Sequence, residues 1–331
     1  DVSRVIVKLM QEGVMAAMNQ KIDYETAHII AEDFNIQTER GKADAIEEDD
    51  GNSIKDIIKK EENLMPRPPV VVVMGHVDHG KTTLLDTIRK TKIADTESGA
   101  ITQHMGAYQA MIEHPVDKKK RLITFIDTPG HEAFRGMRSR GGRVADIAVL
   151  VIAADDKIQP QTLESISIIQ KEGLSMIVAI NKVDKPDADI DRIKTQLSEI
   201  NLSPEDWGGN TICIPISAKS NTNIDALLEH ILLIADIEEL KANPNGTLYG
   251  TIIESRIDKG LGPVATAIIQ NGTLKIGDMI MCGNAGGKVK SLQDYLGKSI
   301  EQAMPSMPVR ILGLKPVPQV GELIKQVENY K

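Results

Sequence analysis

The sequence predicts an α/β fold in which a doubly wound sheet is preceded by a short helical segment and followed by a small antiparallel β-barrel. Apolar, strand-like runs alternate with amphipathic helices over residues 70–235. Helical patterns stop after residues 243–246, which read NPNG, and apolar residues recur at helical spacing within residues 2–34. Alternating strands and helices imply a mostly parallel sheet that is covered by helices on both faces.

The doubly wound part is expected to contain six strands and five helices. We expect strands at 70–74, 107–113, 121–126, 146–152, 175–180 and 211–215. We expect helices at 81–90, 131–141, 160–171, 188–200 and 223–235. The run 147–152 (IAVLVI) is apolar throughout, which is typical of a strand that is buried on both faces.

The segment 247–331 contains short strand-like runs that are separated by turn residues, and this pattern predicts a small antiparallel barrel. Asn271 and Gly272 lie between two apolar runs. Asn-Gly in this setting is a strong signal for a tight hairpin. We therefore assign residues 245–331 to a β-barrel domain and residues 66–241 to the α/β domain.

The N-terminal region is expected to form two amphipathic helices. The first places Val2, Ile6 and other apolar residues at helical spacing, and the second begins with Asp23 as its N-cap. We expect residues 1–37 to form a small helical module. Residues 38–65 are polar and acidic, and we interpret them as a linker.

Composition and charge narrow the class of protein. The chain has 331 residues, of which 41% are hydrophobic and 26% are charged, as in a soluble protein of several domains. Its longest apolar run, 147–154, is far shorter than the roughly 20 residues that span a bilayer. The net charge is −8, of which −7 falls within residues 1–65. This charge neither excludes a nucleic-acid partner nor supplies a basic footprint for one.

The two cysteines and the N-terminal residues of the chain indicate in which cellular compartment the protein is found. Cys213 and Cys282 both lie in apolar, strand-like runs, so we expect buried thiols and not a disulfide or a metal site. The chain opens with a charged stretch instead of an apolar signal sequence. We therefore expect a cytoplasmic protein. Because the first residue is Asp1 and not Met, we also expect a fragment of a longer protein.

Residues 75–82 read GHVDHGKT and fit the phosphate-binding pattern G-x-x-x-x-G-K-[ST] between a strand and a helix. Glycines let backbone amides face a triphosphate at a helix N-terminus, which favours anions. Lys81 is expected to reach the β and γ phosphates, and Thr82 to bind Mg²⁺. The residues expected to bind the nucleotide in this region are Gly75, Val77, Asp78, His79, Gly80, Lys81, Thr82 and Thr83.

Residues 127–130 read DTPG and follow the expected strand 121–126. A carboxylate at this point, Asp127, can reach Mg²⁺ through water, and the amide of Gly130 can approach the γ-phosphate. A threonine between the two motifs is needed to close over the γ-phosphate and Mg²⁺. We expect Thr102 to do so, with Thr96 as the competing candidate.

Two further motifs indicate that the bound nucleotide carries guanine. Asn181, Lys182 and Asp184 belong to an NKVD sequence after the strand 175–180. The Asp184 carboxylate can accept both N1–H and the exocyclic amine of guanine, a pair of donors that adenine lacks. Asn181 would add a polar contact, and the stem of Lys182 can stack beneath the ring. After the next strand come Ser217, Ala218 and Lys219, where a backbone amide can meet guanine O6.

The histidines and one basic run need separate interpretations. His131 follows Gly130, so it stands beside the γ-phosphate and can orient the attacking water. His76 and His79 lie inside the phosphate loop, where side chains often point away, and we interpret their rings as structural. His28, His114 and His230 are interpreted as ordinary surface or helix residues. The basic run 118–121 (KKKR) is either a solvated hairpin tip or a contact for RNA phosphate.

The segments 75–82 (GHVDHGKT) and 127–131 (DTPGH) together resemble the translational GTPases. Ras-like and Era-like GTPases usually carry Gln or an apolar residue where this chain has His131. Within the translational family, residues 99–108 (GAITQHMGAY) and 134–141 (FRGMRSRG) resemble bacterial translation initiation factor two. The resemblance covers essentially the whole chain. It is closest over residues 66–240.

This resemblance implies a P-loop GTPase that binds both ribosomal subunits, favours initiator tRNA and hydrolyses GTP when the subunits join. It implies catalytic roles for His131, Lys81, Thr102 and Gly130. It also implies an apolar gate formed by Val77 and Ile101, and a monovalent cation near Asp78. The domain that grips the initiator tRNA would follow Lys331. We expect a monomer without a membrane partner.

Two other functions remain open from the sequence. The first is another ribosome-associated GTPase, of the elongation or selenocysteine-delivery type, although residues 103–108 (QHMGAY) argue against it. The second is a GTP-gated binding module in which hydrolysis is incidental. GTP turnover that ribosomes leave unchanged would favour the binding module.

Overall fold

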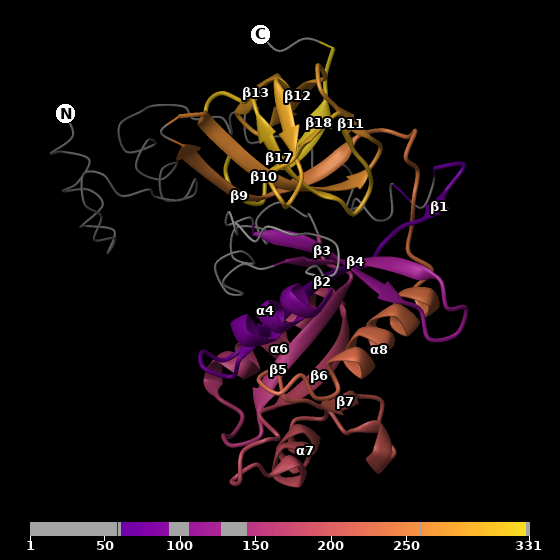
Figure 1. The fold of residues 1–331 in the computed structure, drawn as a ribbon, viewed down its shortest axis with the longest axis vertical. Helices are drawn as coiled ribbons and strands as arrows, with labels where there is room; N and C mark the ends of the chain where they lie inside the picture. Colours follow the sequence, from indigo (N-terminus) through magenta and orange to yellow (C-terminus); the bar gives the residue numbers. More distant parts are fainter. Residues whose placement is uncertain (1–57, 59–60, 93–105, 127–143, 259, 329–331) are drawn as a thin grey trace, which may run out of the picture. The chain divides into compact units, whose positions relative to one another are not determined.

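The computed structural model describes residues 58, 61–92, 106–126, 144–258 and 260–328. The chain divides into two units, Asp1–Asn52 and Ser53–Lys331, and all described residues belong to the second. The expected N-terminal helices and the expected helix 131–141 lie outside the described residues. In the second unit, a mixed α/β sheet is followed along the chain by an antiparallel β domain (Figure 1), so the predicted fold class is confirmed.

The α/β sheet contains six strands in the order β3-β4-β2-β5-β6-β7. These strands are β2 (Val70–Gly75), β3 (Ala107–Glu113), β4 (Lys120–Ile126), β5 (Ile147–Ala153), β6 (Ser175–Asn181) and β7 (Ile212–Pro215). The strands β3 and β4 pair antiparallel, and the other neighbours are parallel. The helices are α4 (Lys81–Lys92), α6 (Pro160–Glu172), α7 (Ile190–Glu199) and α8 (Ile224–Ile237). Each of these bounds lies within two residues of its prediction.

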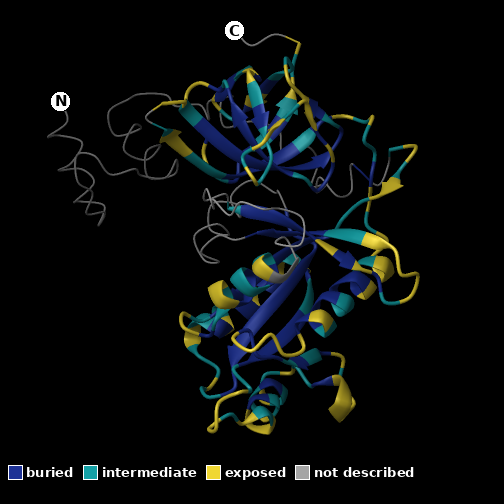
Figure 2. Ribbon diagram, in the orientation of Figure 1, coloured by how far each residue is buried: buried dark blue, intermediate teal, exposed yellow. Residues whose placement is uncertain are grey.

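The sheet is covered by helices on both faces because its strands are apolar on both sides. In β2, Val71 and Val73 join an apolar cluster with side chains of α4 and α8. Their neighbours Val70 and Val72 join a second cluster with side chains of α6 and α7. Every residue of β5 is buried (Figure 2), as its unbroken apolar run predicts. The two clusters pack helices against both faces of the sheet.

Local sequence signals set the ends of the helices beside that edge. Pro160 stands at the start of α6, where the missing N–H costs nothing. The helix ends at Gly173, whose φ of 56° is the left-handed value that glycine adopts without strain. The Asp189 side chain caps α7 by accepting a hydrogen bond from the amide of Arg192 at 2.9 Å.

The β domain contains an eight-stranded antiparallel sheet in the order β13-β12-β18-β9-β10-β17-β14-β15. Its strands are β9 (Tyr249–Asp258), β10 (Gly262–Asn271), β12 (Met279–Cys282), β13 (Ala285–Lys288), β14 (Ser291–Gln293), β15 (Ser299–Ile300), β17 (Pro308–Leu312) and β18 (Leu323–Gln326). Two small sheets pair β1 (Met65–Pro66) with β8 (Lys241–Ala242), and β11 (Leu274–Lys275) with β16 (Gln302–Ala303). The domain has an apolar core of its own.

The hairpin expected at Asn271 and Gly272 is wrong. The strand β10 ends at Asn271, but the next strand, β11, pairs with β16 and not with β10. The buried Asn271 side chain instead donates to the carbonyl of Thr247 at 2.8 Å and to the carboxylate of Glu61 at 3.1 Å. A Cβ on Gly272 would lie 2.8 Å from the backbone of Leu248. This Asn-Gly pair therefore serves a long-range packing contact.

Within the described residues, none of the helices is long and apolar enough to cross a membrane.

Candidate nucleotide-binding site

Four polar loops follow the carboxyl ends of neighbouring parallel strands. They are residues 76–80 after β2, 155–156 after β5, 182–185 after β6 and 217–219 after β7. Because these strands are parallel neighbours, the four loops meet at one edge of the sheet. That edge is where doubly wound folds bind ligands.

The segment 75–80 has two positions, Gly75 and Gly80, where the backbone permits only glycine. Gly75 has a φ of 135°, and a Cβ there would lie 2.3 Å from the carbonyl oxygen of Val151 on β5. Gly80 has a φ of 93°, and a Cβ there would lie 2.3 Å from Nδ2 of Asn181. The loop therefore packs directly against β5 and the end of β6. Asp78, which is exposed, also has a positive φ of 65°.

The expected phosphate-binding lysine lies across this loop. Nζ of Lys81 donates to the carbonyl of His76 at 2.6 Å. Burial lowers the pKa of Lys81, and the charge of Asp78 partly opposes that effect. Thr82 and Thr83 are exposed in the first turn of α4. The ammonium group and the helix N-terminus thus lie on the same loop, where an anion would be favoured.

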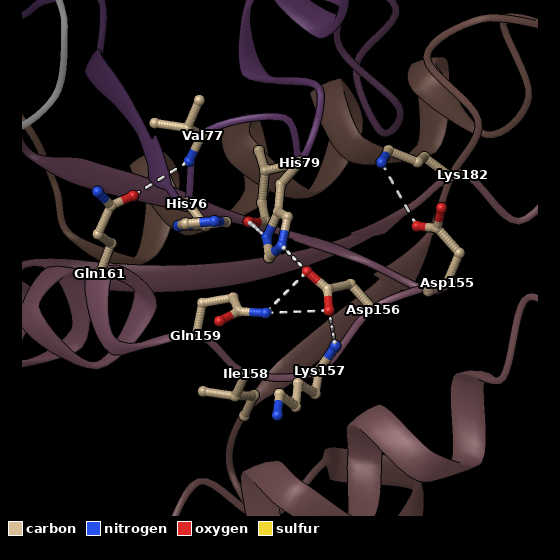
Figure 3. A network of polar contacts seen from close by, with 12 residues as sticks. His76, Val77, His79, Asp155, Asp156, Lys157, Ile158, Gln159, Gln161 and Lys182 are labelled. Carbon is tan, nitrogen blue, oxygen red and sulfur yellow. Dashed lines mark hydrogen bonds and ion pairs between the residues drawn. The ribbon is translucent and has the colours of Figure 1, made fainter.

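The ring of His79 holds the loop to the segment that follows β5. Its Nε2 lies 3.2 Å from Asp156 Oδ2, and its Nδ1 lies 3.4 Å from the carbonyl oxygen of Val151 (Figure 3). The ring is buried, so desolvation lowers its pKa despite the two hydrogen-bond partners. Asp156 is held in turn by the Lys157 amide at 2.8 Å and by Nε2 of Gln159 at 3.0 Å. The His79 ring points away from the loop, in agreement with its structural interpretation.

A second hydrogen bond reaches the loop from α6. The backbone amide of Val77 donates to Oε1 of Gln161 at 3.3 Å. Val77 is 57% exposed, so its side chain faces solvent. Its expected partner in the apolar gate, Ile101, lies outside the described residues, as does His131.

Asn181 connects two of the expected nucleotide motifs. Its Nδ2 donates to the carbonyl of His79 at 2.9 Å, and its Oδ1 accepts from the amide of Ala218 at 3.0 Å. Asn181 is buried. The structure therefore places its amide between the two loops, whereas the sequence suggested a contact with the base.

The expected guanine acceptor lies beside these loops. Asp184 is exposed, and its Oδ1 accepts a hydrogen bond from the buried hydroxyl of Ser217 at 2.6 Å. This hydrogen bond lowers the pKa of Asp184. Lys182 adopts a positive φ of 64°, and its Nζ lies 3.4 Å from Asp155 Oδ1. Lys219 is exposed next to Ala218. The arrangement offers a fixed, ionised carboxylate at the open edge of the sheet.

Most of the residues expected around Mg²⁺ and the γ-phosphate lie outside the described part of the chain. Asp127, Gly130 and His131 lie outside the described residues, as do Thr102 and its competitor Thr96. Thr82 is thus the one expected Mg²⁺ ligand that the structure places. Its exposed hydroxyl at the N-terminus of α4 is a hard oxygen donor of the kind that Mg²⁺ prefers. Among the described residues, no group of three or more His, Cys, Asp and Glu side chains could hold a metal ion.

The interpretation of His114 as an ordinary surface residue is wrong. Its ring is buried, with Nδ1 3.2 Å from Asp117 and Nε2 3.0 Å from Asp236 on α8. Arg121, the last residue of the basic run, also binds both carboxylates. The remaining lysines, 118–120, are exposed. His230 lies on α8, as expected, and its Nδ1 is 2.7 Å from the carbonyl oxygen of Ala226. His28 is outside the described residues.

Comparisons with known families agree with this geometry. Residues 67–236, more than half of the chain, match the elongation factor Tu GTP-binding domain. The chain belongs to this GTP-binding domain family. GTP binding and GTPase activity are properties of the family. The GTP-binding domain is followed by residues 247–327, which match domain 2 of elongation factor G.

Several curated proteins that resemble this chain are named translation initiation factor IF-2. The protein called translation initiation factor IF-2 of Caldanaerobacter subterraneus subsp. tengcongensis is 52% identical over 329 residues. That of Finegoldia magna is 49% identical over 330 residues. The match covers 99% and 100% of this chain but 45% and 42% of those proteins. The chain therefore spans less than half the length of these relatives.

Solved structures of translational GTPases share the fold. GDP-bound aIF5B from Aeropyrum pernix is 30% identical, with a TM-score of 0.67 over 80% of this chain and 55% of that one. The apo form of elongation factor SelB from Methanococcus maripaludis is 26% identical, with a TM-score of 0.60 over 80% and 57%.

Proposed function

We propose that this chain is the GTP-binding and GTP-hydrolysing part of a cytoplasmic bacterial translation initiation factor. The observation that carries the proposal is the meeting of the phosphate loop, Asn181 and the Asp184–Ser217 pair at one sheet edge. Relatives about 50% identical over the whole chain carry the initiation factor name.

The phosphate loop would hold the nucleotide through backbone amides and the Lys81 ammonium. The rigid packing of Gly75 and Gly80 against β5 and Asn181 supports this role, because a preformed loop loses little freedom on binding. Mg²⁺, when bound, would neutralise charge on the β and γ phosphates. Thr82 would bind it directly, Asp127 would act through water, and Thr102 would join in the GTP state.

Asp184 would select guanine by accepting its two donors, while Ser217 fixes the carboxylate. Asn181 would act indirectly, by holding the phosphate loop and the Ala218 segment together. The stem of Lys182 would stack beneath the ring, and the turn at Lys219 would meet the base edge.

Hydrolysis would depend on positioning, because phosphoryl transfer needs orientation and charge stabilisation more than covalent chemistry. His131 would orient the attacking water, and Gly130 would approach the γ-phosphate. Val77 and Ile101 would keep His131 from the water until a partner acts, and Asp78 would help to hold a monovalent cation. Turnover without the ribosome would therefore be slow.

The partners would be both ribosomal subunits and, through further domains of the longer protein, initiator tRNA. The chain itself would be a monomer. SelB-type factors share the fold, so a selenocysteine-delivery role is the competing proposal. Residues 103–108 (QHMGAY) favour initiation over that role.

The test is single-turnover GTP hydrolysis with and without ribosomes, in the full-length protein and its His131→Ala variant. We expect slow intrinsic turnover in both proteins and strong stimulation in the wild type alone. Partners accelerate such GTPases by up to about 10⁵-fold. Full stimulation of His131→Ala would show that another residue orients the water. Turnover that ribosomes leave unchanged would favour a binding module with incidental hydrolysis.

A further inference from the structure

Asp155, the first of two carboxylates after β5, faces two lysines from the segment that carries the guanine motif. Its Oδ1 lies 3.4 Å from Nζ of Lys182, and its Oδ2 binds Nζ of Lys185. The Asp155 side chain is only 11% exposed, whereas those of Lys182 and Lys185 are 26% and 46% exposed. Figure 3 shows the carboxylate of Asp155 beneath the Lys182 ammonium.

The charge on Asp155 is maintained by these two lysines. Burial alone would raise the pKa of its carboxyl, but the hydrogen bond from Lys185 and the charge of Lys182 outweigh that effect and lower the pKa. Asp155 is therefore an ionised carboxylate at neutral pH, within ion-pair distance of Lys182 in the guanine motif. The phosphate loop contacts the neighbouring carboxylate, Asp156, through the ring of His79. Asp155 does not take part in that contact.

The two ends of Lys182 are both restrained. Its backbone follows the buried Asn181, whose side chain bonds the phosphate loop and Ala218, and it adopts a left-handed φ of 64°. Its ammonium group is drawn to Asp155. The four-carbon stem of Lys182 between these points is thereby confined. A long, flexible side chain that is already ordered loses less entropy when a ligand packs on it.

We propose that Asp155 is a positioning residue of the guanine site, which acts by tethering the ammonium group of Lys182 so that its stem is ordered for the base. The inference rests on the proposed function, because it requires guanine to lie against that stem. Lys185, the second partner of Asp155, lies on the solvent side and would not share this role.

The experiment measures the affinity of fluorescent mant-GDP for the wild type, Asp155→Asn, Lys182→Met, the double variant and the control Lys185→Met. We expect Asp155→Asn to weaken binding about 2- to 10-fold, the equivalent of ordering one long side chain on binding. Removing a negative charge near a diphosphate would on Coulomb's law alone tighten binding, so weakening is specific to the tether.

The double variant separates positioning from a general structural role. Met keeps an apolar stem but has no ammonium group, so Lys182→Met should bind like the double variant, and Asp155→Asn should add nothing to it. Lys185→Met should bind mant-GDP with the affinity of the wild type, because it leaves the contact between Asp155 and Lys182 in place. If Asp155→Asn does not fold, Lys182→Met tests the same contact and should itself weaken binding.

Four results would overturn the inference. Two concern single variants: Asp155→Asn binds mant-GDP as tightly as the wild type or more tightly, or Lys182→Met binds it as tightly as the wild type. The other two are a double variant whose loss of affinity is the product of the two single losses, and a Lys185→Met variant that loses as much affinity as Asp155→Asn. In each of them the wild type still binds mant-GDP, so the proposed function stands. Failure of the wild type to bind mant-GDP would refute the proposed function, and the inference with it.

Discussion

The side chain of Asn181 donates a hydrogen bond to the carbonyl of His79 at 2.9 Å, and this bond joins the end of β6 to the phosphate loop. The other end of the same amide accepts from the backbone of Ala218 at 3.0 Å. One buried side chain thus satisfies polar groups from two loops that are far apart in the sequence. Loss of this amide is expected to disturb both loops together.

Asn181→Ala should destabilise the protein and weaken nucleotide binding. The substitution leaves a buried carbonyl at His79 and a buried amide at Ala218 without partners, at about 1–3 kcal/mol per group. Urea unfolding would report the lost free energy, and mant-GDP titration would report the lost affinity. An unfolding free energy equal to that of the wild type would show that the bridge is dispensable.

Gly80→Ala should impair nucleotide binding, whereas Gly208→Ala should not. Both glycines have a positive φ, 93° and 82°, and both variants bear the strain of about 1–2 kcal/mol that a side chain meets there. A Cβ on Gly80 would lie 2.3 Å from Nδ2 of Asn181, while one on Gly208 would meet nothing within 4 Å. Comparison of mant-GDP affinities in the two variants separates the effect of the contact with Asn181 from the effect of backbone strain. Equal losses of affinity would contradict this assignment.

Much of the fold was predictable because its signals are local. The apolar run of β5, Pro160 at the start of α6 and Gly173 at its end set element bounds without reference to the rest of the chain. The failure at Asn271 has the opposite cause. Its side chain is occupied by Glu61 and Thr247, and such long-range partners cannot be read from neighbouring residues.

The nucleotide-binding motifs of the candidate site were predictable from the sequence, but the side-chain contacts that hold their loops in place were not. The positions of Lys81 at the start of α4 and of Asp184 after β6 followed from the spacing of the motifs. The contact of the buried His79 with Asp156 did not, because the two residues are 77 positions apart. Carboxylates directly after the buried strand β5 were the available signal. His114 was missed for the same reason, since its partner Asp236 comes from α8.

The stability of the protein should fall as the pH is lowered from about 7 through the titration range of His79. Burial lowers the pKa of His79 in the folded state below its ordinary value of 6.5. Between the folded and unfolded pKa values the unfolded chain binds more protons, so the unfolding free energy decreases as the pH falls, by at most about 1.4 kcal/mol per pH unit for one group. Urea unfolding at several pH values should give a shallower dependence for His79→Gln. Identical slopes would refute this origin.

Native protein should react slowly with iodoacetamide at pH 8. Cys282 is buried and Cys213 is half-buried, and burial raises the pKa of their thiols to about 12 and about 11. Because the thiolate is the nucleophile, both residues should be alkylated far more slowly than in urea-unfolded protein. Mass spectrometry of the two peptides would measure this. Equal rates in native and unfolded protein would contradict the assigned burial.

Asp184, at the carboxyl edge of the sheet, is expected to select guanine over adenine. Competition of other nucleotides against mant-GDP tests this selectivity most directly. Wild-type protein should prefer GDP and GTP over ATP by a wide margin. Asp184→Asn leaves the guanine donors without their acceptor, which weakens GDP binding by about 1–3 kcal/mol per group. The same variant should bind xanthosine diphosphate better than the wild type does, because an amide can donate to its C2 oxygen. Equal affinities of the wild type for ATP and GTP would contradict the account.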